Sequence, residues 1–141
     1  PGSNLAFKPI PADGGFTGSR GDGLGAGRMN TAMCVTHYEG YEDFSGCAAN
    51  VCAKYTLTSG GVEYGDWYLP SLYELELMYN NVGQGNALGL GNVANFAFDV
   101  YWSSIESGTA PADAWRFYFV TGTSSLFDKE DQASVRAIRA F

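Results

Sequence analysis

Residues 101–141 decide the fold, and they read YWSSIESGTAPADAWRFYFVTGTSSLFDKEDQASVRAIRAF. The run from Trp115 to Val120 is rich in aromatic residues, which are typical of a β-strand. Side chains alternate between the two faces of a strand, so Trp115, Phe117 and Phe119 point the same way. Three large aromatic side chains on one face predict a buried core beneath this strand.

The opposite face of this strand has an unusual composition. After a turn at Thr121 and Gly122, a second run repeats the alternation. Together the two runs place these residues on the outer face: Arg116, Tyr118, Val120, Thr123, Ser125 and Phe127. Tyr and Arg are favoured at interfaces, and Ser and Thr adapt their hydrogen bonds. The mixture predicts a contact surface, with burial of both faces as the alternative.

Length and composition indicate one compact domain. The 141 residues include 45% hydrophobic side chains, 19 glycines and only 16% charged residues, which favours a loop-rich fold with a real core. The formal net charge is −7, from 15 acidic and 8 basic residues. Nucleic acids and sulfated glycans require clustered Lys and Arg. The charge therefore argues against both, and it leaves neutral glycans, proteins and basic surfaces as partners.

The ends of the chain say little about where the protein resides. Pro1–Ser3 looks like a cloning remnant, and residues 4–141 are expected to form a single domain. No apolar run approaches the length of a membrane span, so membrane insertion is not expected.

Three cysteines, Cys34, Cys47 and Cys52, leave at least one thiol unpaired, which argues against a disulfide framework as the basis of the fold. The spacing is not that of a metal site, and His37 is the only histidine. The sequence favours buried or free structural thiols over a metal site, and it indicates no cofactor.

Local signals predict several shorter elements. A first strand is expected over residues 5–8. Asn30 or Thr31 can cap a helix that ends at Tyr38, and Ser45 can open a second helix. Between residues 80 and 99 there is no period, which predicts a long loop.

The clearest local signal is the run Ser71-Leu72-Tyr73-Glu74, which follows Pro70. It matches a capping box, in which the Ser71 hydroxyl accepts from the Glu74 amide while the Glu74 carboxylate accepts from the Ser71 amide. Apolar residues then recur at helical spacing. The sequence predicts a core-facing helix here, and the cap explains Glu74 without a catalytic role.

Further residues form an ordered set that extends over roughly residues 20 to 141. The set is Gly25-Ala26-Gly27, Asn30-Thr31, Ala48-Ala49, Asp66-Trp67-Tyr68-Leu69-Pro70-Ser71, Glu74-Leu75, Tyr101-Trp102-Ser103-Ser104, Ala114-Trp115, Phe119, Gly122, Lys129 and Val135-Arg136-Ala137-Ile138-Arg139. It resembles the C-type-lectin-like domains, which include the C-terminal domains of bacterial collagen-like adhesins. It resembles more closely the variable proteins of diversity-generating retroelements in phages, bacteria and archaeal viruses.

The resemblance implies an α+β fold, with short helices on a small twisted mixed sheet and long ordered loops. It also implies a ligand-binding protein, at a virion or cell surface, that recognises a protein or glycan on a target. Residues 101–141 would be the variable region. The implied variable positions are Ile105, Ser107, Arg116, Tyr118, Val120, Thr121, Thr123, Ser125, Leu126, Phe127, Asp128 and Asp131. The implied scaffold positions are Trp67, Trp102, Trp115, Phe119, Gly122, Arg136 and Arg139.

Other functions remain as alternatives. One is a fixed lectin or adhesin, which would be calcium-independent because the sugar-binding motifs Glu-Pro-Asn, Gln-Pro-Asp and Trp-Asn-Asp are absent. Another is an enzyme, because formylglycine-generating enzymes share a distant version of the implied fold. Those need a cysteine pair near the C-terminal end, whereas all cysteines here lie within the first 52 residues. No nucleophile, base and stabiliser converge in the sequence, so no enzyme activity is expected.

Arg20-Gly21-Asp22 matches a cell-attachment tripeptide, but its Gly-rich context favours an ordinary loop.

Overall fold

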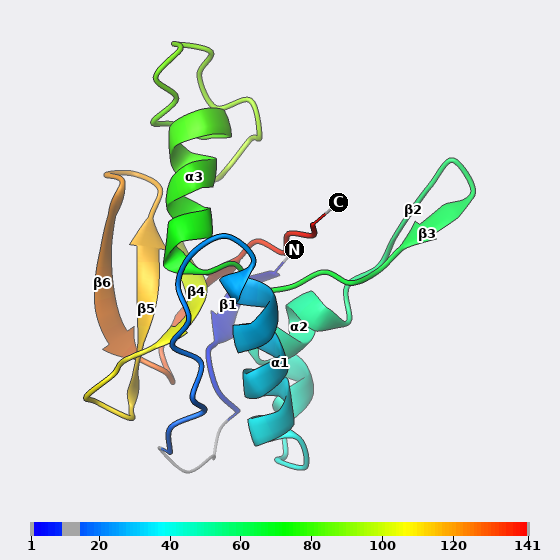
Figure 1. Ribbon diagram of the computed structural model, residues 1–141, viewed down its shortest axis with the longest axis vertical. Helices are drawn as coiled ribbons and strands as arrows, with labels where there is room; N and C mark the ends of the chain where they lie inside the picture. The colour runs from blue at the N-terminus through cyan, green and yellow to red at the C-terminus, as the bar shows by residue number, and fades with distance from the viewer. Residues whose placement is uncertain (1, 10–14, 141) are drawn as a thin grey trace.

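A computed structural model describes residues 2–9 and 15–140, and it shows helices packed on a mixed β-sheet (Figure 1). Pro1 of the expected cloning remnant lies outside the described residues, as do residues 10–14 and Phe141. The helices are α1 (Ala26–Tyr38), α2 (Ala48–Ala53) and α3 (Leu72–Val82), with a short 3-10 helix η1 (Phe44–Gly46). The strands are β1 (Gly2–Ala6), β2 (Leu57–Ser59), β3 (Val62–Tyr64), β4 (Val100–Glu106), β5 (Asp113–Tyr118), β6 (Thr123–Asp128) and β7 (Gln132–Val135).

The main sheet has the strand order β1-β7-β4-β5-β6. Neighbouring strands are antiparallel, except that β4 and β7 are parallel. The first and last strands of the chain therefore lie side by side. This architecture confirms the predicted α+β class with a small mixed sheet.

The helices cover both faces of the sheet. Tyr101 and Trp102 are adjacent on β4, and adjacent side chains point to opposite faces. Tyr101 belongs to a buried cluster with Leu75 of α3. Trp102 belongs to another cluster, with Cys34 of α1 and Ala48 of α2. Helix α3 therefore packs on one face, while α1 and α2 lie on the other.

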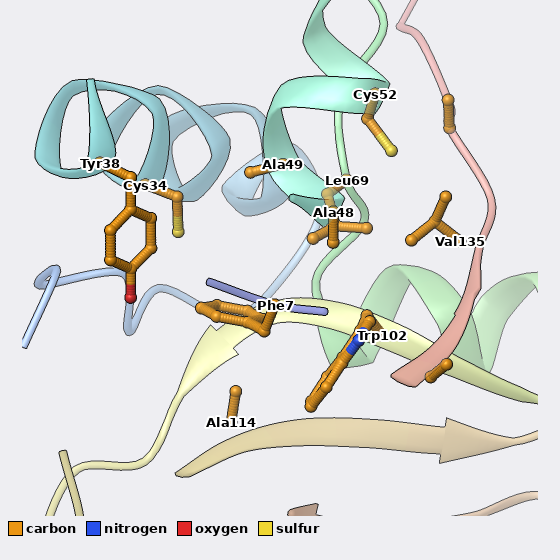
Figure 2. Close-up of a cluster of buried hydrophobic side chains, with 12 residues drawn as sticks. Phe7, Cys34, Tyr38, Ala48, Ala49, Cys52, Leu69, Trp102, Ala114 and Val135 are labelled. Carbon is orange, nitrogen blue, oxygen red and sulfur yellow. The ribbon is translucent and has the colours of Figure 1, made fainter. Parts of the chain in front are cut away.

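Trp102 lies in the core beneath α1 and α2 (Figure 2). It is fully buried, and its ring meets that of Phe7 edge-on at 5.4 Å between centroids. Its Nε1 donates to the backbone carbonyl of Leu5 at 2.8 Å. The indole thus buries a large apolar surface while its one polar atom is satisfied, as buried Trp requires.

The second cluster is aromatic and lies under α3. Phe117 and Phe119 belong to it, as the alternation predicted, and Tyr79 of α3 packs against both rings. The prediction that Trp115 shares this core is wrong, because its side chain is only partly buried and belongs to neither cluster. Helix α3 contacts the later part of β5, whereas Trp115 lies earlier, opposite Leu126, which is 37% exposed.

The capping box that starts α3 is confirmed in both directions, between Ser71 and Glu74. The start of α1 was predicted wrongly: it begins at Ala26, after Gly25 in the left-handed conformation. Asn30 and Thr31 lie inside the helix, where their side chains are buried and hydrogen-bonded to other segments. A buried polar side chain can thus mimic a cap signal in the sequence.

Two further boundaries differ from expectation. Ser45 lies in η1, and α2 begins only at Ala48. The first strand is β1, Gly2–Ala6, rather than residues 5–8. The loop predicted over residues 80–99 is present once α3 ends at Val82.

A small hairpin of β2 and β3 was not predicted. Gly60 and Gly61 form its two-residue turn, with φ of 59° and 78°. Positive φ at both turn positions suits the twist of a tight hairpin and favours glycine. The hairpin projects away from the rest of the molecule (Figure 1), and among the described residues its strands pair only with each other.

Candidate functional site

Strands β5 and β6 bring most of the predicted contact residues onto one face. Directly paired residues of antiparallel strands point to the same side. Arg116 pairs with Ser125, and Tyr118 pairs with Thr123. We call this surface the β5–β6 face, and it comprises Arg116, Tyr118, Thr123, Ser125 and Phe127. The alternation read from the sequence is therefore confirmed for this face.

Arg116 lies at the base of the face and is only 6% exposed. Its Cζ is 4.0 Å from the ring centre of Trp102 and 4.6 Å from that of Phe127. Asp131 stands beside it, with Oδ2 3.6 Å from Nη2. Burial lowers the pKa of Arg116, and the carboxylate of Asp131 opposes that shift. The sequence predicted an exposed contact residue, whereas the guanidinium supports the face from beneath.

The outer part of the face is aromatic and hydroxyl-bearing. The rings of Tyr118 and Phe127 are 6.2 Å apart, and the hydroxyl of Ser125 donates to that of Tyr118 at 3.3 Å. These three side chains are half-buried, while Thr123 is exposed. Thr121, in the turn, shares a 2.7 Å hydrogen bond with Thr123. Such side chains can contact a partner through apolar rings and adaptable hydrogen bonds.

Two of the implied variable positions are buried away from this face. Ile105 and Ser107 are 6% and 1% exposed. Strand β4 is central and covered on both faces, and its pairing with β5 shifts register between Trp102 and Glu106. The Ser107 hydroxyl accepts from the amides of Thr109 and Ala110 and so holds the following loop. The placement of these two residues on a variable surface is corrected accordingly.

The remaining implied positions are exposed but scattered around the face. Val120 is 56% exposed just beyond β5, and Leu126 points to the opposite side of β6. Asp128 and Asp131 are exposed at the end of β6 and in the turn that follows. These two carboxylates lie next to the β5–β6 face and add negative charge beside it.

Among the predicted scaffold residues, Trp102 and Phe119 are fully buried. Gly122 adopts a φ of 71°, and the ring of Tyr79 lies where its side chain would be. Trp67 is half-buried, with its ring 5.2 Å from that of Tyr55.

The two C-terminal arginines of the predicted scaffold tie the tail to the rest of the molecule. Arg136 Nη2 donates to the carbonyl of Ala94 at 3.0 Å, and its guanidinium lies over the ring of Phe96. Arg139 lies 3.6 Å from the carboxylate of Asp66 and over the ring of Tyr64. Both positions therefore have a structural role.

A buried ion pair supports the same region and was not found from the sequence. Glu106 and Lys129 are fully buried side chains that lie 2.9 Å apart. Glu106 also accepts from the amides of Thr17 and Gly18 at 2.8 and 2.6 Å. Burial raises the pKa of Glu106, but these hydrogen bonds and the charge of Lys129 outweigh it, so the pKa is lowered. The pair is 23 residues apart, and no local pattern reveals it.

The Glu74 carboxylate does more than cap α3. It accepts from the amides of Gly25 and Gly27 and from the hydroxyl of Tyr68. A Cβ on Gly27 would lie 2.5 Å from Glu74 Oε2. This carboxylate thus joins the start of α1 to the start of α3, which is a structural role.

Other side chains that could take part in chemistry are buried or hydrogen-bonded within the fold. The hydroxyls of Ser103 and Ser104 are buried and bonded to Trp115 and Asn30. All three cysteines are free and buried, as the sequence favoured. Asp22 of the Arg-Gly-Asp tripeptide accepts from the amide of Tyr73 at the start of α3. Across the described parts of the chain, no three His, Cys, Asp or Glu side chains form a group suited to a metal ion.

No protein-family model matches the chain, and no curated protein matches it. Within residues 2–9 and 15–140, none of the helices has the length and apolar character needed to cross a lipid bilayer.

Proposed function

We propose that the protein is a ligand-binding module of C-type-lectin-like fold, and that its β5–β6 face recognises a protein or glycan on a target surface. In this proposal it is a variable protein of a diversity-generating retroelement, as the resemblance of its sequence implies. It would act at a virion or cell surface, and it carries no catalytic role.

The β5–β6 face is the observation that carries the proposal. Strand β5 is held by buried residues on both sides, with Phe117 under α3 and Ala114 against the other core. Tyr118, Thr123 and Ser125 belong to neither core cluster. Their side chains can therefore change while the backbone pairing and the core remain. A rigid strand pair with replaceable outer side chains is the arrangement that a recognition surface requires.

A pair of surface-display libraries tests this division. One randomises Tyr118, Thr121, Thr123 and Ser125, and the matched library randomises four buried positions, Trp102, Ala114, Phe117 and Phe119. We expect most members of the first library to resist protease and few of the second, because buried positions tolerate little change in volume. Equal loss of resistance in both would contradict the proposal, as would failure to select binders to a soluble test protein from the first.

A fixed, calcium-independent lectin or adhesin is the second candidate. The observation in its favour is the half-exposed ring of Tyr118 beside Phe127, because an exposed aromatic ring can stack on a sugar. Binding of a neutral glycan that persists in chelator and is lost in Tyr118→Ala would support it.

A further inference from the structure

Arg116 is held in an unusual environment for a charged side chain. Its guanidinium lies between the rings of Trp102 and Phe127 and is almost entirely buried. The two rings fix the cation, and its Nε and Nη2 atoms are buried, with the Asp131 carboxylate beside Nη2. A carboxylate that took the place of Asp131 would therefore meet a guanidinium that is already fixed in orientation.

The donors of this guanidinium are incompletely used. Among the described residues, Arg116 Nε and Nη2 have no hydrogen-bond acceptor. Asp131 is the charged neighbour, but its Oδ2 lies 3.6 Å from Nη2, which is too long for a hydrogen bond. Buried charged donors without acceptors are unfavourable. The Asp131 side chain is 53% exposed, so it can swing into solvent at little cost.

The surrounding charges allow one carboxylate to replace another. The groups that act on Arg116 are Asp131, Tyr118 and Asp128. If a ligand carboxylate takes the place of Asp131, the guanidinium still faces one close negative charge. A ligand carboxylate that reaches both donors would add the hydrogen bonds that Asp131 lacks.

We propose that the β5–β6 face binds a partner protein that inserts an Asp or Glu carboxylate at Arg116, in place of Asp131. This inference rests on the proposed function of the face. A protein is favoured over an acidic glycan because the ring of Phe127 lies over the cation and that of Tyr118 lies 6.2 Å from Phe127. Aromatic residues with Arg are typical of the centres of protein interfaces.

Two blocked peptides serve as probes, acetyl-Trp-Glu-Trp-amide and the matched acetyl-Trp-Gln-Trp-amide. Binding to the full chain is followed by NMR through the Nε–H signal of Arg116. Asp131→Asn removes the competing carboxylate, and Asp128→Asn is the control with the same change in charge. Arg116→Lys keeps the positive charge but cannot form the paired hydrogen bonds.

The Glu peptide should shift the Arg116 signal, and the Gln peptide should not. Affinity for the Glu peptide should rise about tenfold in Asp131→Asn, the size expected of one charge-assisted hydrogen bond. It should rise much less in Asp128→Asn and fall in Arg116→Lys. Should Arg116→Lys fail to fold, the two Asp variants decide the outcome by themselves.

The inference is overturned if both peptides bind equally, if the two Asp variants behave alike, or if the Arg116 signal does not respond. N-acetylneuraminic acid is tested in parallel, and binding of this sugar acid with the expected variant pattern in place of the peptide would also overturn it. The library experiment is independent of these outcomes, because its randomised positions exclude Arg116 and Asp131. A negative result with the peptides therefore does not decide the proposed function of the β5–β6 face, which the libraries test separately.

Discussion

Gly122 is required for two separate reasons. Its φ of 71° is in the left-handed region, and an added Cβ would lie 2.6 Å from Cε1 of Tyr79. Left-handed geometry costs a residue with a Cβ about 1–2 kcal/mol, and overpacking costs about 1–3 kcal/mol more. We expect Gly122→Ala to lower the free energy of unfolding by roughly 2–5 kcal/mol in urea titrations.

Two other glycines separate these contributions. Gly40 has a φ of 96° but open space around its Cβ position, so Gly40→Ala should cost only the backbone term. Gly108 has neither constraint, and Gly108→Ala should be close to neutral. Equal effects at all three glycines would show that Tyr79 does not constrain the turn.

The Glu106–Lys129 pair makes stability depend on pH. The pKa of Glu106 is lowered from its ordinary value of 4.5, so its contribution is fully present above that pH. It is lost as the pH falls through the folded-state pKa. Glu106→Gln should cost about 3–5 kcal/mol at neutral pH, because Lys129 is left buried and unpaired. The difference from the unmodified protein should shrink below pH 4.5.

Chemical unfolding at a series of pH values measures this effect. Glu63→Gln is the control, because Glu63 is exposed on the β2–β3 hairpin. Adding Lys129→Met to Glu106→Gln should restore part of the lost stability, since the unpaired charge is then removed. A pH-independent cost of Glu106→Gln would contradict the assigned pairing.

At the scale of elements, the β2–β3 hairpin should be the least protected part of the sheet structure. All of its residues are exposed except Tyr64, and a two-stranded hairpin is marginally stable by itself. Its amides should exchange through local opening that costs at most about 2 kcal/mol, whereas β4 and β5 should approach the global stability. Hydrogen exchange followed by mass spectrometry distinguishes them. Strong protection of the hairpin would mean that another surface covers it.

Elements defined by local signals could be predicted from the sequence. The capping box at Ser71 and Glu74 depends on neighbours in the chain, and it was predicted correctly. The alternation along β5 and β6 placed Tyr118 and Ser125 on the same face, because the side-chain period of a strand is fixed. The lectin-like fold and the function of this face stay predictions.

The sequence-based predictions that failed concern residues whose surroundings are set by contacts distant in the sequence. Ile105 is buried because β4 is a central strand that is covered on both faces, which alternation alone does not reveal. Trp115 lies outside the core because α3 covers only part of β5, and Arg116 is buried because Trp102 and Phe127 enclose it. The ion pair of Glu106 with Lys129 likewise requires knowledge of the tertiary structure.

For the whole molecule, the cysteines report on global unfolding. Burial raises the pKa of Cys34 to about 11 and that of Cys52 to about 12, and it also raises that of Cys47. The thiolate is the reactive form, so the folded protein should react very slowly with a disulfide reagent at pH 8. All three thiols should react quickly in strong denaturant. Fast labelling of the folded protein would show that the core beneath α1 and α2 opens locally.

The central claim is that the β5–β6 face is a replaceable recognition surface, and sequencing the native locus across many clones tests it most directly. We predict a near-copy of the segment that encodes residues 101–141, close to a reverse transcriptase gene. Differences between clones should occur at template adenines and fall at Tyr118, Thr121, Thr123 and Ser125, sparing Trp102. A locus without a repeat, or with variation spread evenly over buried and exposed positions, would contradict the claim.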